Sequence, residues 1–194
     1  MNRLRVTKVR EVYGPTRSNA GDAGLDFYTP TNLRYAELLK ANENAENIVV
    51  NSTTSGIGMV GVDIEPETSF VKAIHMGPHS RILIPSGIRV LLEPKDSMLM
   101  AANKSGISTK KGLVYTAEVV DTPYLGEIHI GLANTAATTT RIEFSQKSKV
   151  VQFVHVPIML TEPEFISNEE YEAAAKEWDT TRGTKGLGSG DNEK

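Results

Sequence analysis

Short runs of apolar, often β-branched residues alternate with turn residues along most of this chain. A period of two is typical of strands with one buried face, and few segments show the period of an amphipathic helix. Gly77-Pro78, Pro85-Ser86-Gly87 and Pro94-Lys95-Asp96 supply the backbone torsions that a change of direction needs. The pattern predicts an all-β barrel or jelly roll. Its expected strands cover residues 4–9, 25–28, 70–74, 80–84, 88–92, 97–101, 114–120, 127–133, 141–144 and 150–158.

Residues 31 to about 66 interrupt this rhythm. Tyr35–Ala41 consists of good helix formers, and Ile48–Ile64 mixes apolar residues with Ser, Thr and Gly. We interpret the segment 31–66 as an insertion that contains a short helix and a hairpin. A second helix is predicted over Asn168–Trp178, with Ser167 or Asn168 capping its start.

Composition limits the classes of protein to which the chain can belong. Its 194 residues are 39% hydrophobic, which suits one domain with a substantial core. The net charge of −3 comes from interspersed acidic and basic residues, so we expect no nucleic-acid polymer as a partner and only a small ligand. No long apolar run or leader sequence is visible, and cysteine is absent, so we expect a cytoplasmic protein without membrane contact or disulfides.

The segment from Val119 to Ile128 places an acid and an aromatic residue at a turn. Branched residues precede Asp121, Thr122-Pro123 interrupts the strand, and alternation resumes after it. We predict a β-hairpin that presents Asp121 beside Tyr124. An Asp beside a Pro commonly just initiates a turn, so this pattern alone leaves a structural and a catalytic role open.

Two further segments have the composition of anion-binding loops. Lys104 supplies a positive charge, Ser105 a hydroxyl donor, and Gly106 room for a ligand to approach the backbone, although such tetrapeptides are common in ordinary loops. From Thr180 onward the chain is polar, and Arg182 and Lys185 lie among glycines. That segment is either a disordered terminus or a tail that closes over a phosphate.

Asp26 is an acid within the predicted strand 25–28, where an apolar residue is expected. A carboxylate in such a place needs a cation, N–H groups or a metal-bound water as its partner.

Taken in order, these segments resemble the trimeric dUTP pyrophosphatases (dUTPases), a family found in bacteria, eukaryotes and viruses, with a phage or bacterial member as the nearest kind. The five family motifs have counterparts at residues 23–26, 104–107, 119–127, 147–153 and 182–189. The third, Val-Val-Asp-Thr-Pro-Tyr-Leu-Gly-Glu, is the most specific, and the fourth is degraded. The resemblance covers most of the chain except residues 31–66.

This resemblance implies a distorted jelly-roll β-barrel and Mg²⁺-dependent hydrolysis of dUTP to dUMP and pyrophosphate. Asp121 would be the general base that activates water for attack on the α-phosphorus, and Tyr124 would exclude a 2′-hydroxyl. Magnesium would bind mainly to triphosphate oxygens, with Asp26 holding its waters. The implied substrate-binding residues are Lys104, Ser105, Gly106, Tyr124, Gln152, Arg182, Lys185, Gly186, Leu187, Gly188 and Ser189.

The resemblance also implies a homotrimer whose active sites are shared between subunits, with residues 1–179 as the β domain and 180–194 as a lid. Several residues differ from the family pattern, among them Lys185, Glu118 and Leu125, and two of the differences affect expected substrate contacts. Lys104 stands where an Arg is usual, so the bidentate contact of a guanidinium with phosphate is lost. Leu187 replaces a Phe that stacks on uracil.

Two alternatives remain open at this point. The chain could be a catalytically altered relative that acts as a nucleotide-dependent module and binds a protein partner through the insertion. It could also resemble the related dCTP deaminases, although the pairing of Asp121 with Tyr124 favours dUTP hydrolysis.

Overall fold

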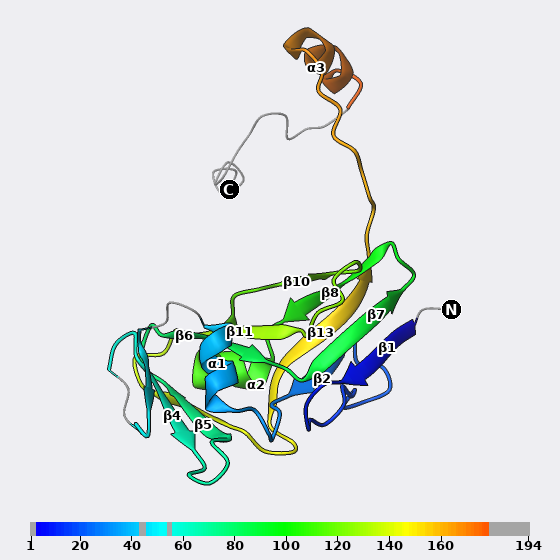
Figure 1. Cartoon of the computed structure of the whole chain (residues 1–194). Helices are drawn as coiled ribbons and strands as arrows, with labels where there is room; N and C mark the ends of the chain where they lie inside the picture. Colours follow the sequence, from blue (N-terminus) through cyan, green and yellow to red (C-terminus); the bar gives the residue numbers. More distant parts are fainter. Residues whose placement is uncertain (1–2, 43–45, 54–55, 179–194) are drawn as a thin grey trace. The chain divides into compact units, whose positions relative to one another are not determined.

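The computed structural model describes residues 3–42, 46–53 and 56–178, and it divides the chain into two compact units, Met1–Met159 and Leu160–Lys194. The described part of the first unit is built mainly of strands, which confirms the all-β prediction (Figure 1). Its strands are β1 (Arg3–Lys8), β2 (Gly24–Tyr28), β3 (Ile48–Val50), β4 (Val60–Ile64), β5 (Val71–Met76), β6 (Arg81–Pro85), β7 (Ile88–Glu93), β8 (Ser97–Ala102), β9 (Leu113–Tyr115), β10 (Val119–Asp121), β11 (His129–Asn134), β12 (Thr140–Glu143) and β13 (Lys149–Pro157). Its helices are α1 (Tyr35–Ala41) and α2 (Ser105–Lys111).

The strands form small sheets that share one hydrophobic core. Their orders are β10-β8-β13-β2, β6-β11-β9, β12-β5-β4-β3 and β1-β7. Alternate residues of the strands point inward, as the period of two predicts, and the core includes the buried side chains of Phe27, Ile74, Ile84, Leu99 and Leu132. The four-stranded sheet β10-β8-β13-β2 carries Asp121 on one edge strand, β10, and Asp26 on the other, β2.

The predicted hairpin around Asp121 is wrong in its pairing. β10 pairs with β8, whereas β11 pairs with β6 and β9, so the connection between β10 and β11 crosses from one sheet to another. The single strand predicted over 114–120 is likewise two strands in different sheets. Pro123 cannot donate to a ladder, and the Thr122 hydroxyl instead donates to the carbonyl of Ser97. Residues 122–128, which we name the β10–β11 loop, therefore leave the β8 sheet.

Lys104 and Ser105 lie at the start of a helix rather than in a simple loop. Lys104 is the N-cap of α2, and its carbonyl accepts hydrogen bonds from the N–H groups of Ile107 and Ser108. The helix ends at Gly112, whose φ of +66° is left-handed. Sequence patterns do not identify this helix because it is only two turns long and contains Gly and β-branched residues.

The insertion contains the predicted helix with the predicted bounds, Tyr35–Ala41. The hairpin expected within Ile48–Ile64 is wrong, because β3 and β4 run parallel and β4 forms its antiparallel pair with β5. α1 is held against the domain at two points. Leu38 is fully buried, and the Asn42 side chain exchanges two hydrogen bonds with the backbone of Leu83 in β6.

The described part of the second unit, residues 160–178, contains α3 (Asn168–Ala175). Ser167 is its N-cap, as one of the two predicted options: its hydroxyl accepts from the N–H of Glu170, whose carboxylate accepts from the N–H of Ser167. The helix is shorter at its C-terminal end than the predicted 168–178. Among the described residues, no helix is long and apolar enough to cross a membrane.

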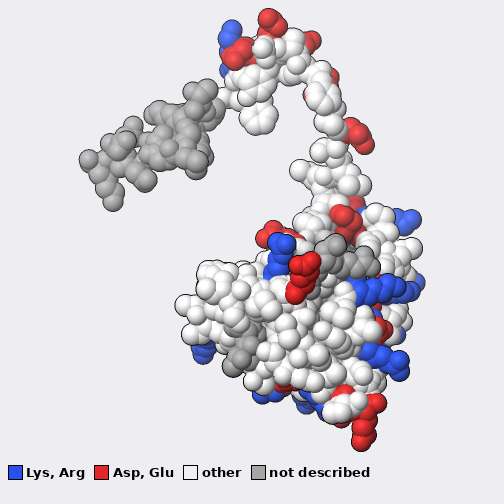
Figure 2. Space-filling model, turned by 60° about the vertical axis from the view of Figure 1, so that its left-hand side comes forward, with Lys and Arg blue, Asp and Glu red and all other residues white. Residues whose placement is uncertain are grey.

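Charged side chains of both signs are mixed on the face of the first unit that Figure 2 shows. This distribution agrees with the small net charge of the sequence.

Candidate functional site

The first half of the candidate site is a pocket beside the C-terminal end of β10. Asp121 is the last residue of that strand, and its side chain is exposed. The pocket has a volume of about 230 Å³. Val119, Val120, Asp121, Tyr124, Ile128 and His129 line it. Asp121 and Tyr124 therefore lie together, as predicted, although the two flanking strands do not pair.

Tyr124 makes two hydrogen bonds within the β10–β11 loop. Its N–H donates to the carbonyl of Asp121 over 3.1 Å, and its hydroxyl donates to the carbonyl of Glu127 over 2.8 Å. Its ring covers Gly126 so closely that a Cβ there would lie 2.5 Å from Tyr124 Cζ. The Tyr-x-Gly-Glu sequence thus makes a loop in which the ring is held over a glycine and faces the same pocket as Asp121.

The second half is a polar pocket of about 340 Å³ around Asp26 in β2. Lys104 Nζ lies 2.7 Å from Asp26 Oδ1, and Lys149 Nζ lies 2.6 Å from Asp26 Oδ2. Ser18 Oγ donates to Oδ2 over 3.1 Å. The sequence predicted that this acid within a strand needs a partner. Two cations and a hydroxyl fill that role.

The electrostatics of Asp26 follow from these partners. Burial by itself raises the pKa of the Asp26 carboxyl, but the hydrogen bonds from Lys104, Lys149 and Ser18 outweigh it and hold this pKa below its ordinary value. The hydrogen bond with Asp26 also raises the pKa of the Lys149 ammonium. The pair is ionised at neutral pH.

Gln152 in β13 completes the polar pocket. It lies directly across from Asp26 in the antiparallel pair of β13 and β2, and its Nε2 donates to the carbonyl of Asn103. A Cβ on Gly24 would lie 2.5 Å from Gln152 Oε1. A larger residue at position 24 would therefore make the Gln152 side chain shift, which gives one reason for a glycine in the first motif.

The two pockets lie far apart within one chain. Asp121 and Asp26 are on the two outer strands of the sheet β10-β8-β13-β2, and Asp121 aligns with Met98 of β8 whereas Asp26 aligns, through Gln152, with Ala102. Three strand spacings across and four residues along the sheet separate their Cα atoms by about 20 Å. One nucleotide phosphate cannot contact both side chains of the same chain.

The remaining predicted site residues, Arg182, Lys185, Gly186, Leu187, Gly188 and Ser189, lie outside the described residues.

Comparison with known proteins identifies the family. Over 134 residues the chain is 31% identical to the deoxyuridine 5′-triphosphate nucleotidohydrolase of Mycolicibacterium gilvum, a match that covers 68% of this chain and 81% of that protein. This chain belongs to the dUTPase family. No family model matches it.

Solved dUTPase structures share the fold. A variant of the Staphylococcus bacteriophage 80alpha dUTPase with dUpNHpp superposes with a TM-score of 0.66 at 18% identity, covering 98% of this chain and 99% of that chain. A variant of the phage phi11 dUTPase of S. aureus, which coordinates a structural Mg(II) ion, gives 0.57 at 17% identity, covering 86% and 98%. At this identity the likeness confirms the dUTPase jelly-roll fold and nothing finer.

The described residues of this dUTPase do not form a metal site of their own. Within them, no three His, Cys, Asp or Glu side chains converge. The carboxylate of Asp26 already accepts from two ammonium groups and a hydroxyl, so a metal ion bound directly to it would face two positive charges.

Sequence inspection missed Ser18, which donates to Asp26, and it also missed a second partner of Asp26, Lys149. Lys149 lies in the degraded fourth motif, and its signal is a lysine on the strand that faces a strand-embedded acid. A second group that was missed, Arg10 with Glu37 and Glu127, is described below.

We expect Asp26→Asn to lower the free energy of unfolding at pH 7 by about 1–3 kcal/mol, because two lysines lose their anion. The folded-state pKa of Asp26 is depressed, so its stabilisation is present above the unfolded value of about 3.9 and is lost as pH falls through the folded value. The difference between wild type and variant should therefore shrink below about pH 4. Urea unfolding at several pH values measures this, with the exposed Asp96→Asn as control; a difference independent of pH contradicts it.

Proposed function

We propose that this chain hydrolyses dUTP to dUMP and pyrophosphate, with Asp121 as general base. The observation that carries the proposal is the exposed carboxylate of Asp121 in one pocket with Tyr124, whose hydroxyl donates to the carbonyl of Glu127. An ionised carboxylate can accept a proton from a water molecule while that water attacks the α-phosphorus, and pyrophosphate then leaves. Family membership supports the same reaction.

Tyr124 supplies the discrimination between deoxyribose and ribose in this proposal. Its hydroxyl is engaged with the carbonyl of Glu127 and its ring is packed on Gly126, so the ring cannot move aside cheaply for a 2′-hydroxyl. A fixed ring rejects a larger sugar by steric exclusion. UTP is therefore a poor substrate.

The polar pocket supplies phosphate binding. Lys104, Ser105 and Gly106 occupy the N-cap and first turn of α2, and Gln152 lies beside them in the sheet. A cation, a hydroxyl and an amide donate to phosphate oxygens more strongly as negative charge grows on them in the transition state. The ammonium group of Lys104 would then contact both Asp26 and a phosphate of the nucleotide.

We infer that the active form is a homotrimer with shared sites, because the two pockets of one chain are too distant for one nucleotide. The Asp121 pocket of one subunit would meet the Lys104 pocket of another. Residues 180–194, with Arg182, Lys185, Gly186, Leu187, Gly188 and Ser189, would close over the bound nucleotide as a lid beyond a domain of residues 1–179.

Magnesium enters this proposal with the substrate, as the Mg–dUTP complex. Hard divalent cations prefer phosphate and water oxygens, and the described residues lack a carboxylate cluster that would hold the ion without nucleotide. Asp26, which already binds two lysines and Ser18, could hold a magnesium-bound water at an acceptor site that these partners leave. Within this proposal the reaction takes place in the cytoplasm, where nucleotides are processed.

A protein partner bound through residues 31–66 stays a prediction. Within this segment, β3 is an edge strand of the sheet β12-β5-β4-β3, and its residues Val49 and Val50 are partly exposed.

A nucleotide panel tests the proposed reaction. Purified protein with magnesium is expected to release pyrophosphate from dUTP much faster than from UTP, dCTP or dTTP. Ammonia release from dCTP is measured in parallel and is expected to be absent. Intact trimers without dUTP hydrolysis, or with ammonia release, would contradict the proposal.

A further inference from the structure

A half-buried arginine, Arg10, joins two carboxylates that lie far apart in the sequence. Its Nε and Nη2 contact the two carboxylate oxygens of Glu127 at 2.8 and 3.1 Å, and its Nη1 contacts Glu37 Oε1 at 2.7 Å. The side chains of Arg10 and Glu127 are only 15% and 14% exposed. A planar guanidinium bound in this forked manner fixes the position of both partners.

Glu127 is the residue of the β10–β11 loop that Arg10 contacts. Besides Arg10, its carboxylate accepts from the N–H of Gly87, and its backbone carbonyl accepts the hydroxyl proton of Tyr124. The next residue, Ile128, exchanges backbone hydrogen bonds with Ser86 and Ile88. The side chain of Glu127 is thus bound by Arg10 and Gly87, and the backbone carbonyl of the same residue binds the hydroxyl of Tyr124.

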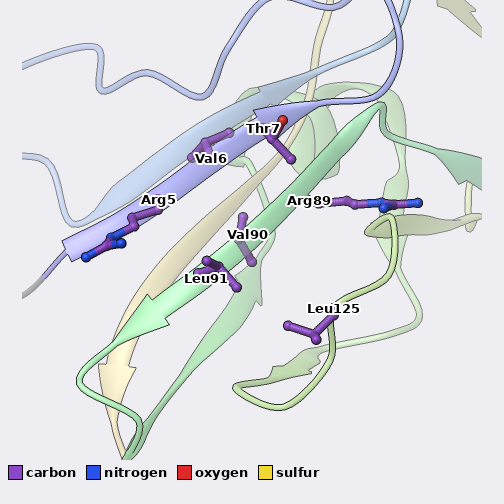
Figure 3. Close-up of a pocket in the computed structure, with 7 residues that line it drawn as sticks. All are labelled: Arg5, Val6, Thr7, Arg89, Val90, Leu91 and Leu125. Atoms are coloured by element: carbon purple, nitrogen blue, oxygen red, sulfur yellow. The ribbon is translucent and has the colours of Figure 1, made fainter.

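The tip of the β10–β11 loop also lies beside β7. Figure 3 shows Leu125 facing that strand, where it lines a shallow pocket of about 330 Å³ together with Val90 and Leu91. These apolar contacts are open to solvent, since Leu125 is 63% exposed and Leu91 49%. The ion pair of Glu127 with Arg10 therefore attaches the loop more firmly than the contacts of Leu125 with β7.

Glu37 is the other end of the chain of contacts. It is the N3 residue of α1, and its second oxygen accepts from the N–H of Arg34. The helix is anchored by Leu38 and Asn42, so Glu37 presents its carboxylate from a fixed support. Burial raises the pKa of Glu37, but the hydrogen bonds from Arg10 and Arg34 outweigh it and keep this carboxyl below its ordinary pKa. It is charged at neutral pH.

We propose that Glu37 of the inserted helix is a positioning residue for Tyr124, acting through Arg10 and Glu127, and that it thereby strengthens the preference for deoxyribose over ribose. The order of contacts is α1, Arg10, Glu127, Tyr124. This inference rests on the proposed function, in which Tyr124 excludes the 2′-hydroxyl. It gives the insertion a role inside the enzyme.

Glu37→Gln tests this role while keeping an oxygen that can accept from the N–H of Arg34. The ratio of kcat/KM for dUTP to that for UTP is expected to fall by about threefold to fivefold, because a partly exposed ion pair with Arg10 is lost. Glu65→Gln is the matched control. Glu65 also lies within residues 31–66, pairs with Lys72 at 2.9 Å and is 37% exposed, against 42% for Glu37. It should leave the ratio unchanged.

A double-mutant cycle separates positioning from a general loss of stability. Tyr124→Phe removes the hydroxyl that binds the carbonyl of Glu127, so adding Glu37→Gln to it should change the selectivity ratio little further. Additive effects of the two substitutions, or an unchanged ratio in Glu37→Gln alone, would overturn the inference.

Hydrogen exchange distinguishes failure of this inference from failure of the proposed function. Faster exchange of the amides of residues 122–128 is expected in Glu37→Gln and not in Glu65→Gln, whatever reaction the protein catalyses. If the wild type hydrolyses no dUTP but this difference appears, the proposed function fails and the positioning contact stands. Equal exchange in the three proteins refutes the contact.

Discussion

Asp121→Asn is expected to reduce turnover of dUTP by about a thousandfold, which is the usual contribution of a general base. The amide has the shape of the carboxylate but cannot accept the proton of the attacking water. Since Asp121 is exposed at the end of β10, the substitution should leave folding and nucleotide binding nearly unchanged. Single-turnover pyrophosphate release and calorimetric titration with a non-hydrolysable dUTP analogue measure the two effects separately.

Asp96→Asn is the matched control for this experiment. Asp96 is another exposed aspartate, in the turn between β7 and β8, and it lines neither pocket. Its substitution should retain full turnover. Turnover of Asp121→Asn close to that of the wild type would refute the assignment of the base, and loss of binding together with turnover would point to a structural role instead.

Deletion of residues 182–194 is expected to lower kcat/KM for dUTP by about a hundredfold, because the closing of a lid over the phosphates aligns substrate and water. The thermal unfolding temperature should stay the same, since the core residues belong to the unit Met1–Met159. Steady-state kinetics and thermal unfolding of the truncated chain provide the two measurements.

A shorter deletion, of residues 191–194, serves as control because it leaves the fifth motif through Ser189 intact. It should keep the kinetics of the full chain. Equal kcat/KM in the longer deletion would show that the lid has no part in catalysis, and the phosphate contacts would then come from the described residues alone.

The strands were predictable because burial of one face imposes a period of two, and ten of the expected segments overlap observed strands. Pairing was less predictable. The alternation on both sides of Pro123 is equally compatible with a hairpin and with a crossing between sheets, and only contacts distant in sequence, such as Ile128 with Ile88, decide between them.

The candidate site shows the same division. An acid within a predicted strand indicated that Asp26 needs a partner. The structure shows Lys104 and Lys149 as partners, and only Lys104 was predicted as a site residue. Arg10 gave no signal at all, because an arginine after a predicted strand is an ordinary surface residue until two distant carboxylates meet it.

The placement of Asp121 and Asp26 on opposite edges of one sheet affects how mutations act in the proposed trimer. A chain altered in both pockets damages two different active sites, whereas a chain altered twice in one pocket damages a single site. In a host that contains two versions of the gene, the same number of substitutions can therefore inactivate different shares of the mixed trimers. The edge of the sheet on which a substitution falls decides how far its effect spreads among subunits.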